Sequence, residues 1–137
     1  MFYLIYVSSA VKLMDDDELL FLLAQSREKN IRLGITGMLL YKAGNFMQML
    51  EGEKQVVLEI YDTIIKDDRH KDVITIITGD IKERNFENWT MGFCNMEKAG
   101  DFPKYSDYIK ENLTLRSFKD DSEFAYRFIT QFNEMNN

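Results

Sequence analysis

The feature that most constrains the fold is a pair of apolar segments, Ile35 to Tyr41 and Asn45 to Glu51, separated by Lys42-Ala43-Gly44. Each segment has the length of a strand, and a short connection that contains glycine is typical of a hairpin. We therefore expect two antiparallel strands here. The helical patterns on either side of them then have to pack on a sheet.

Two segments have the spacing of amphipathic helices. In the first, Asp15 to Glu18 supplies an N-cap and an acidic first turn, and leucines recur at helical spacing up to about Lys29. Asn30 follows, where asparagine is common as a C-terminal cap. In the second, Glu53 to Lys66, apolar residues form one stripe. Each helix therefore has one apolar face to bury.

Three further segments predict strands, namely Phe2 to Ser8, Val73 to Thr78 and Asn88 to Met96. The expected order of elements is βαββαββ. An antiparallel or mixed sheet with both helices on one face closes this order most simply, which is the ferredoxin-like arrangement of the α+β class.

The composition changes after Gly100, and the single proline, Pro103, follows. The spacing of apolar residues beyond it predicts two C-terminal helices, which would cover the open face of the sheet or form a subunit contact. We therefore divide the chain into a core domain, residues 1–97, and a helical extension of the same domain, residues 98–137. The apolar positions are Tyr105, Tyr108, Ile109 and Leu113 in one helix, and Phe124, Phe128, Ile129 and Phe132 in the other.

Size and charge limit the classes of function. A chain of 137 residues with 45% hydrophobic content suits one domain. Its net charge of −6, with no basic block, argues against binding to nucleic acid or to an anionic membrane. No apolar stretch approaches the roughly 20 residues that span a bilayer. The single cysteine, Cys94, suits a small core residue in a reducing cytoplasm.

The sequence carries none of the common catalytic motifs. It has no P-loop, nucleophile elbow, HExxH or GxGxxG, and His70 is the only histidine, so a hydrolytic triad has one possible base. We therefore expect neither an enzyme nor a metal site.

Gln48 is an amide inside an otherwise apolar predicted strand. Alternate strand residues share a face, so Gln48 points the same way as Phe46 and Leu50. If that face is the core, the amide needs polar partners, which a polar-edged ligand would supply. If Met47 and Met49 face the core instead, Gln48 lies in solvent. The strand pattern leaves both alternatives open.

Other residues also have a structural and a functional interpretation. His70 closes Asp67-Asp68-Arg69-His70 at the expected end of the second helix, where a cation suits the helix dipole. Tyr6 is either a core aromatic or a group that transfers electrons and protons. Trp89 and Met91 lie two apart on one face of a predicted strand, which is also typical of a core.

In combination, these segments resemble the BLUF family, blue-light sensors that use flavin adenine dinucleotide (FAD). The resemblance runs from about residue 2 to residue 97, in order and with family-like spacing. It implies the same βαββαββ sheet, with the isoalloxazine ring of FAD, or of FMN or riboflavin, between the two helices. The matching stretches are Leu4-Ile-Tyr-Val-Ser-Ser9, Asn30, Gly34-Ile-Thr-Gly-Met-Leu-Leu-Tyr41, Phe46-Met-Gln-Met-Leu-Glu-Gly52, Asp67-Asp-Arg-His70 and Arg84-Asn-Phe-Glu-Asn-Trp-Thr-Met91.

The resemblance also implies roles for single residues. Tyr6 would give an electron and a proton to the excited flavin, and Gln48 would switch hydrogen bonds between Tyr6 and the flavin N5 and C4 carbonyl. Asn30 would bind the carbonyl and imide edge of the ring, while Trp89 and Met91 would carry the change outward. The other expected cofactor contacts, besides Met91, are Ser8, Lys29, Ile35, Leu39, Phe46, Thr63, Asp67, Arg69 and His70.

The same resemblance implies a short stand-alone receptor without an output enzyme. It would signal through its last strand and C-terminal helices to a separate effector protein, or within a homo-oligomer that is a dimer or larger. A ferredoxin-like fold leaves a second class open, a small-molecule-binding regulatory or protein-interaction module without photochemistry.

Overall fold

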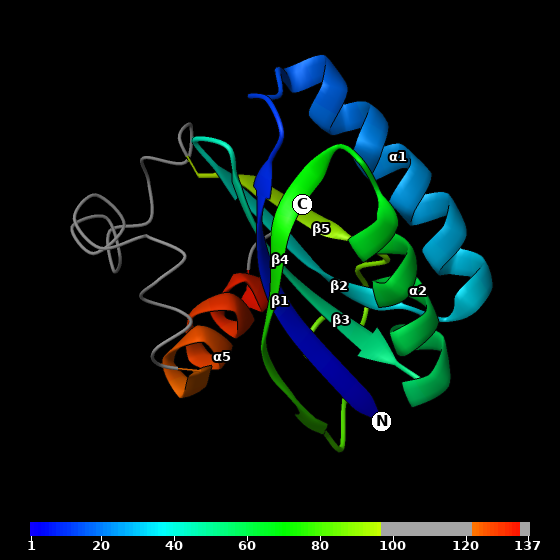
Figure 1. Cartoon of the computed structure of the whole chain (residues 1–137). Coiled ribbons are helices and arrows are strands. Elements are labelled where there is room, and N and C mark those ends of the chain that lie inside the picture. Colours follow the sequence, from blue (N-terminus) through cyan, green and yellow to red (C-terminus); the bar gives the residue numbers. More distant parts are fainter. Residues whose placement is uncertain (97–121, 135–137) are drawn as a thin grey trace.

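The computed structural model describes residues 1–96 and 122–134. The described residues form an α+β structure in which a five-stranded mixed sheet carries helices on both faces (Figure 1). The elements in chain order are β1 (Phe2–Ala10), α1 (Asp16–Leu33), β2 (Thr36–Lys42), β3 (Asn45–Gly52), α2 (Lys54–Lys66), β4 (His70–Asp80), β5 (Gly92–Asn95), α5 (Ser122–Thr130) and the 3₁₀ helix η1 (Gln131–Glu134).

The strands lie in the order β4-β1-β3-β2-β5. β1 pairs antiparallel with both β3 and β4, β2 pairs antiparallel with β3, and β5 pairs parallel with β2. The predicted hairpin is therefore confirmed, with Lys42 opposite Asn45. The predicted placement of the first two helices is also confirmed, because α1 and α2 cover the same face of the sheet (Figure 1).

One face of the sheet packs against α1 and α2, and the other packs against α5; we call them the α1/α2 face and the α5 face. Strand β1 contributes side chains to both. Its even positions, including Leu4 and Tyr6, pack with the helices α1 and α2. Its odd positions, including Ile5 and Val7, pack with α5. Since both faces are buried, nearly every position of this central strand is apolar.

Helix α1 begins as expected and ends later than expected. Asp15 and Glu18 form a reciprocal capping box at its start. At its end Gly34, with a φ of 68°, takes the left-handed cap position that glycine adopts without Cβ strain. The prediction that Asn30 caps this helix is therefore wrong. Asn30 is buried one turn before the cap, and its main-chain carbonyl accepts from the amide of Ile35.

The last two strands also differ from expectation. β4 begins at His70, so His70 does not close the second helix, which ends at Lys66. β5 starts at Gly92 rather than Asn88. Trp89 and Met91 precede it and do not share a strand face, because Met91 packs on the α1/α2 face and Trp89 packs on the α5 face.

A buried carboxylate holds the connection between β4 and β5. Glu51, which is 0% exposed, accepts from the Thr36 hydroxyl at 2.9 Å and from the main-chain amides of Asn85 and Phe86 at 2.6 and 3.0 Å. Arg84 donates to the Thr36 hydroxyl and to the Glu51 carbonyl. These bonds satisfy the buried charge and attach the connection to the ends of β2 and β3.

The second of the two predicted C-terminal helices is present as α5, which packs Ala125, Phe128 and Ile129 on the sheet. The first, around Tyr105 to Leu113, lies outside the described residues. Cys94 is a core residue as predicted, and burial raises the pKa of its thiol to about 11. Among the described helices, none has the length and apolar character needed to cross a membrane.

The hairpin between β2 and β3 supplies a test of local strain. Ala43 and Gly44 have φ values of 48° and 83°, so both central residues of the turn are left-handed. Such turns favour Asn-Gly, because asparagine tolerates positive φ better than alanine. We expect Ala43→Asn to raise the free energy of unfolding by about 0.5–1 kcal/mol, measured by urea denaturation. Ala43→Val should lower it, since a β-branched residue resists positive φ, and equal stability of the two variants would contradict this account.

Candidate functional site

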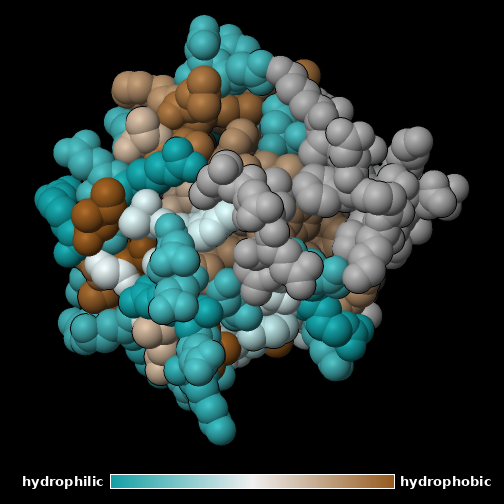
Figure 2. Space-filling model, turned by 180° about the vertical axis from the view of Figure 1, so that it is seen from behind, coloured by the Kyte–Doolittle hydropathy of each residue, from teal (hydrophilic) through white to brown (hydrophobic). Residues whose placement is uncertain are grey.

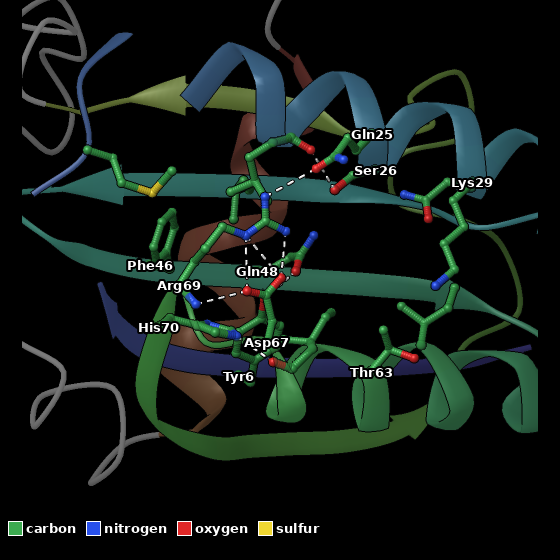
Figure 3. A pocket seen from close by; sticks show the side chains of 16 residues that line it. Tyr6, Gln25, Ser26, Lys29, Phe46, Gln48, Thr63, Asp67, Arg69 and His70 are labelled. Carbon is green, nitrogen blue, oxygen red and sulfur yellow. Dashed lines mark hydrogen bonds and ion pairs between the residues drawn. The ribbon is translucent and has the colours of Figure 1, made fainter. Parts of the chain in front are cut away.

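A cavity of about 240 Å³ lies between α1 and α2, over the middle strands of the sheet (Figure 3). Helix α1 supplies one wall and α2 supplies the other, while β1, β2 and β3 supply the floor. Phe46 lies near one end, and Lys29 and Thr63 lie at the other (Figure 3). The residues that line the cavity are Tyr6, Met14, Leu22, Gln25, Ser26, Lys29, Asn30, Leu39, Phe46, Gln48, Ile60, Thr63, Ile64, Asp67, Arg69 and His70.

Most of the expected cofactor contacts come together at this cavity. Ser8, Ile35 and Met91 lie outside its lining, as does Trp89. Ile35 is instead packed against Gly52, where an added Cβ would lie 2.6 Å from Ile35 Cδ1. The expected residues that do line it are Tyr6, Lys29, Asn30, Leu39, Phe46, Gln48, Thr63, Asp67, Arg69 and His70.

The sequence interpretation missed six lining residues, namely Met14, Leu22, Gln25, Ser26, Ile60 and Ile64. Helical spacing would have identified five of them. Leu22, Gln25 and Ser26 lie seven, four and three positions before Lys29, so they share its helix face. Ile60 and Ile64 lie on one face of α2 in the same way. Met14, in the β1–α1 connection, has no such periodic signal.

A buried hydrogen-bonded chain crosses the floor of the cavity. Tyr6 of β1 and Gln48 of β3 are directly opposite across two antiparallel strands. The Tyr6 hydroxyl donates to Gln48 Oε1, and Gln48 Nε2 donates to Met91 Sδ at 3.2 Å. Gln48 is 5% exposed. Of the two alternatives for this residue, the buried amide is therefore correct.

Burial controls the protonation of Tyr6. It raises the pKa of the Tyr6 hydroxyl far above its ordinary value of 10, and the nearby Tyr61 and Asp67 raise this pKa further. The ring of Tyr61 lies 5.4 Å from that of Tyr6, centroid to centroid. Tyr6 thus remains a neutral phenol and a hydrogen-bond donor across the physiological pH range.

Asn30 connects α1 to the segment that carries Met91. Because α1 continues past Asn30, the side chain is held on a regular helix and turned into the cavity lining. Its Nδ2 donates to the main-chain carbonyl of Thr90 at 2.7 Å. The amide therefore binds a loop of the protein as well as facing the cavity.

Arg69 bridges the two helical walls. Its guanidinium pairs with the Asp67 carboxylate, 2.5 Å away, and donates to Gln25 Oε1 at 3.1 Å on α1 (Figure 3). The hydrogen bonds from Arg69 lower the pKa of Asp67. This bridge closes one side of the cavity with polar groups, and the Arg69 side chain is 40% exposed to solvent.

His70 is oriented by partners at both ring nitrogens. Its Nε2 lies 2.5 Å from the carbonyl oxygen of Ile64, and its Nδ1 lies 2.9 Å from the hydroxyl of Ser8. A carbonyl only accepts, so Nε2 carries a proton, and in the neutral ring the Ser8 hydroxyl donates to Nδ1. Ser8 therefore lies outside the cavity lining and contributes to the site by holding the orientation of the His70 ring.

Thr63 and Tyr41 have their hydroxyl groups engaged with main chain. Thr63 Oγ1 donates to the carbonyl of Glu59, one turn earlier in α2, at 3.2 Å. The Tyr41 hydroxyl accepts from the amide of Met14 at 3.1 Å, which holds the β1–α1 connection at the cavity. The hydroxyl of Thr63 in the cavity lining therefore already has a hydrogen-bond acceptor within α2.

The raised pKa of Tyr6 predicts a pH dependence of stability. Above pH 10 the unfolded chain loses this proton while the folded chain keeps it, so the unfolded state binds fewer protons and the free energy of unfolding falls as pH rises. Between pH 9 and pH 11 wild type should lose about 1.4 kcal/mol more than Tyr6→Phe. Urea unfolding at both pH values measures this difference, and an equal loss in the two proteins would contradict it.

Comparison with known proteins agrees with this geometry. A family model described as sensors of blue-light using FAD matches residues 1–92. The chain is also similar to the photoactivated adenylate cyclase subunit beta of Euglena longa, with 35% identity over 109 residues. Those residues are 79% of this chain and 13% of the relative, so the chain spans only a small part of that protein's length.

Two solved structures match over nearly their full length. The photo-activated state of BlsA has a TM-score of 0.81 and 25% identity, covering 99% of this chain and 96% of that chain. The dark state of BlrB, a BLUF protein, has a TM-score of 0.72 and 26% identity, covering 95% and 96%. Because the family model covers 92 of the 137 residues and the fold matches as well, this chain belongs to the BLUF family of flavin-binding blue-light sensors.

Proposed function

We propose that this protein converts blue light into a change of hydrogen bonding along Tyr6, Gln48 and Met91. One observation carries the proposal. The buried amide of Gln48 lies between a phenol, which donates to its oxygen, and a thioether, which accepts from its nitrogen. The two ends of the amide therefore meet partners of different character, and exchanging them changes both contacts.

The cavity suits a flavin on two grounds. Leu39, Phe46 and Ile60 give it apolar surfaces of the kind that hold a planar ring system. Gln48 Nε2 carries two N–H groups, and the acceptor that it meets among the described residues is a sulfur, which accepts weakly. A stronger acceptor, such as the heteroatom edge of a flavin ring, suits this donor.

The remaining polar residues suit the rest of the cofactor. At about 240 Å³ the cavity is smaller than the roughly 300–1,000 Å³ of most ligand pockets, so it suits the ring better than a complete dinucleotide. Asn30 would bind the polar edge of the ring. Lys29 and Arg69 supply positive charge for phosphate groups, with Asp67 and His70 beside Arg69.

The chemistry of the residues follows from the bond between Tyr6 and Gln48. A bound flavin supplies the absorption of blue light and, when excited, an acceptor for one electron. Tyr6 would be the donor of that electron, and its hydroxyl proton would leave along the bond to Gln48 Oε1. Both would return to Tyr6 afterwards, so no net oxidation would remain. Gln48 would meanwhile rotate or tautomerise.

The exchange of amide ends has a defined consequence at Met91. After rotation the Gln48 oxygen faces the Met91 sulfur, and two acceptors cannot form a hydrogen bond. The amide nitrogen then faces the Tyr6 oxygen, which becomes an acceptor. Met91 thus loses the donor that holds it, and this biases the segment that leads into β5. Trp89, in the same segment, would move with it.

The output would be a change of contacts with a second copy of the chain or with a separate effector protein. Apolar side chains at the surface support this. Leu13, Phe21 and Ile31 are 72%, 63% and 66% exposed. Apolar patches also lie between polar side chains on the face opposite to the view of Figure 1 (Figure 2). Exposed apolar surface of this kind often marks contact sites between proteins.

The first test is the absorption of the protein. The purified protein should carry a flavin, and its visible absorption should shift slightly to the red under blue light and recover in the dark. Gln48→Leu should keep the flavin and lose the shift, because leucine has no hydrogen-bonding ends to exchange. Tyr6→Phe should do the same, because it removes the donor. A difference spectrum before and after illumination measures both.

Gln25→Leu is the matched control, since it makes the same chemical change at another glutamine of the cavity lining. Gln25 accepts from Arg69 and is not bonded to Tyr6. The control should therefore retain the shift. A protein that stays colourless after reconstitution with FAD, or a Gln48→Leu variant with a normal shift, would contradict the proposal and favour a binding module without photochemistry.

The second test concerns the relay. Met91→Ala removes the sulfur that accepts from Gln48, so any light-dependent change in assembly should become weaker while the spectral shift is largely kept. Size-exclusion chromatography with light scattering, in the dark and under blue light, measures assembly. Equal light-dependent changes in wild type and Met91→Ala would count against a relay through Met91.

A further inference from the structure

Three consecutive main-chain carbonyls, those of residues 89 to 91, are each bound by a different donor. The amide of Gly37 on β2 donates to the carbonyl of Trp89 at 3.0 Å. Asn30 Nδ2 donates to the carbonyl of Thr90 at 2.7 Å. Arg27 Nε donates to the carbonyl of Met91 at 2.9 Å. The segment before β5 is therefore attached both to the sheet and to α1.

Arg27 differs from the other two donors. Gly37 acts through its main chain, and Asn30 belongs to the cavity lining. Arg27 lies outside that lining, yet it binds the residue whose sulfur contacts Gln48. Its guanidinium is charged, and hydrogen bonds from charged donors are stronger than those between neutral groups. Neither the motifs nor the spacing of the sequence singled it out.

The packing of residues 89–91 shows which side chain the bond from Arg27 places beside Gln48. Met91 is 1% exposed on the α1/α2 face, whereas Trp89 packs on the α5 face. The Trp89 ring lies over Gly92, where an added Cβ would lie 2.0 Å from Trp89 Cε3. Presenting Trp89 to Gln48 instead of Met91 would need a shift of the segment by two residues. That shift would break the bonds to all three carbonyls and displace the ring from Gly92.

We propose that Arg27 is a positioning residue that holds Met91, rather than Trp89, beside Gln48 by binding the main-chain carbonyl of Met91. The inference rests on the proposed function only for its effect in the light, where Gln48 releases the Met91 sulfur. Arg27 keeps the Met91 main chain attached to α1 after that release and so limits how far the segment moves. It thereby favours the return of the sulfur to Gln48 and speeds recovery in the dark.

The chain offers a direct probe, because Trp89 is its single tryptophan. Its fluorescence and its quenching by acrylamide in the dark report the position of the segment without any photoreaction. Arg27→Met removes the donor but keeps a long side chain at an exposed position, so it leaves no cavity in the core. We expect the acrylamide quenching constant of Trp89 to rise at least about twofold in this variant, since the segment loses one of the three bonds to its main-chain carbonyls.

Arg32→Met is the matched control, an identical change at another exposed arginine of α1. It should leave the quenching constant and the dark recovery unchanged. Arg27→Met should slow dark recovery about five- to tenfold, the effect of losing one charge-assisted hydrogen bond that holds Met91 close to Gln48 while the sulfur returns, and the red shift itself should remain. Arg27→Lys, which keeps a charged donor, should restore both values in part.

The outcomes separate this inference from the proposed function. Equal Trp89 quenching and equal recovery in Arg27→Met and Arg32→Met would overturn the role of Arg27. Absence of the red shift in wild type would contradict the proposed function, and the dark quenching of Trp89 would still decide whether Arg27 positions the segment. If circular dichroism shows that Arg27→Met does not fold, Arg27→Lys and Arg32→Lys are compared instead, and indistinguishable quenching then overturns the inference.

Discussion

A buried amide needs a partner for its oxygen and for its nitrogen, and the arrangement of the site depends on how Gln48 meets this need. Its oxygen accepts from Tyr6 and its nitrogen donates to Met91. The three residues come from β1, from β3 and from the segment before β5, which are far apart in the sequence. The fold must therefore place three distant parts of the chain together before this amide can be buried.

The surrounding structure achieves this by separating the two faces of the sheet. On the α1/α2 face, the helices enclose the cavity and leave Tyr6, Leu39 and Gln48 in a row across three paired strands. On the α5 face, the buried residues that the structure describes are apolar apart from Thr36 and Glu51, which are hydrogen-bonded to each other. The connection between β4 and β5 is bonded to residues on both faces of the sheet. The amides of Asn85 and Phe86 donate to Glu51, and the Met91 sulfur accepts from Gln48. A change at Gln48 therefore acts on a segment that Glu51 also holds.

The differences between sequence expectation and structure have specific causes. Asn30 is a common helix cap, but Gly34 takes that position because glycine adopts positive φ more easily, and this leaves Asn30 inside the helix to bind Thr90. Trp89 and Met91 have strand spacing, but three donors hold their main chain outside the sheet and turn their side chains to opposite faces. Arg27 has no sequence signal, because an exposed arginine on a helix is ordinary until the carbonyl that it binds is known.

The sequence by itself determined the strand and helix order, the hairpin and the N-terminal cap of the first helix, because these depend on periodicity and capping. Most of the cavity lining was expected from the resemblance to the BLUF family and not from these patterns. The sequence pattern around Gln48 allowed either face to be buried. Only the tertiary structure decided that question, because β3 lies between β1 and β2 with α1 and α2 over the face of Gln48 and α5 over the face of Met47 and Met49, so both faces are buried. It likewise decided that Met91 meets Gln48 while Trp89 does not, since that depends on bonds from Gly37, Asn30 and Arg27, which no pattern within residues 89–91 reveals.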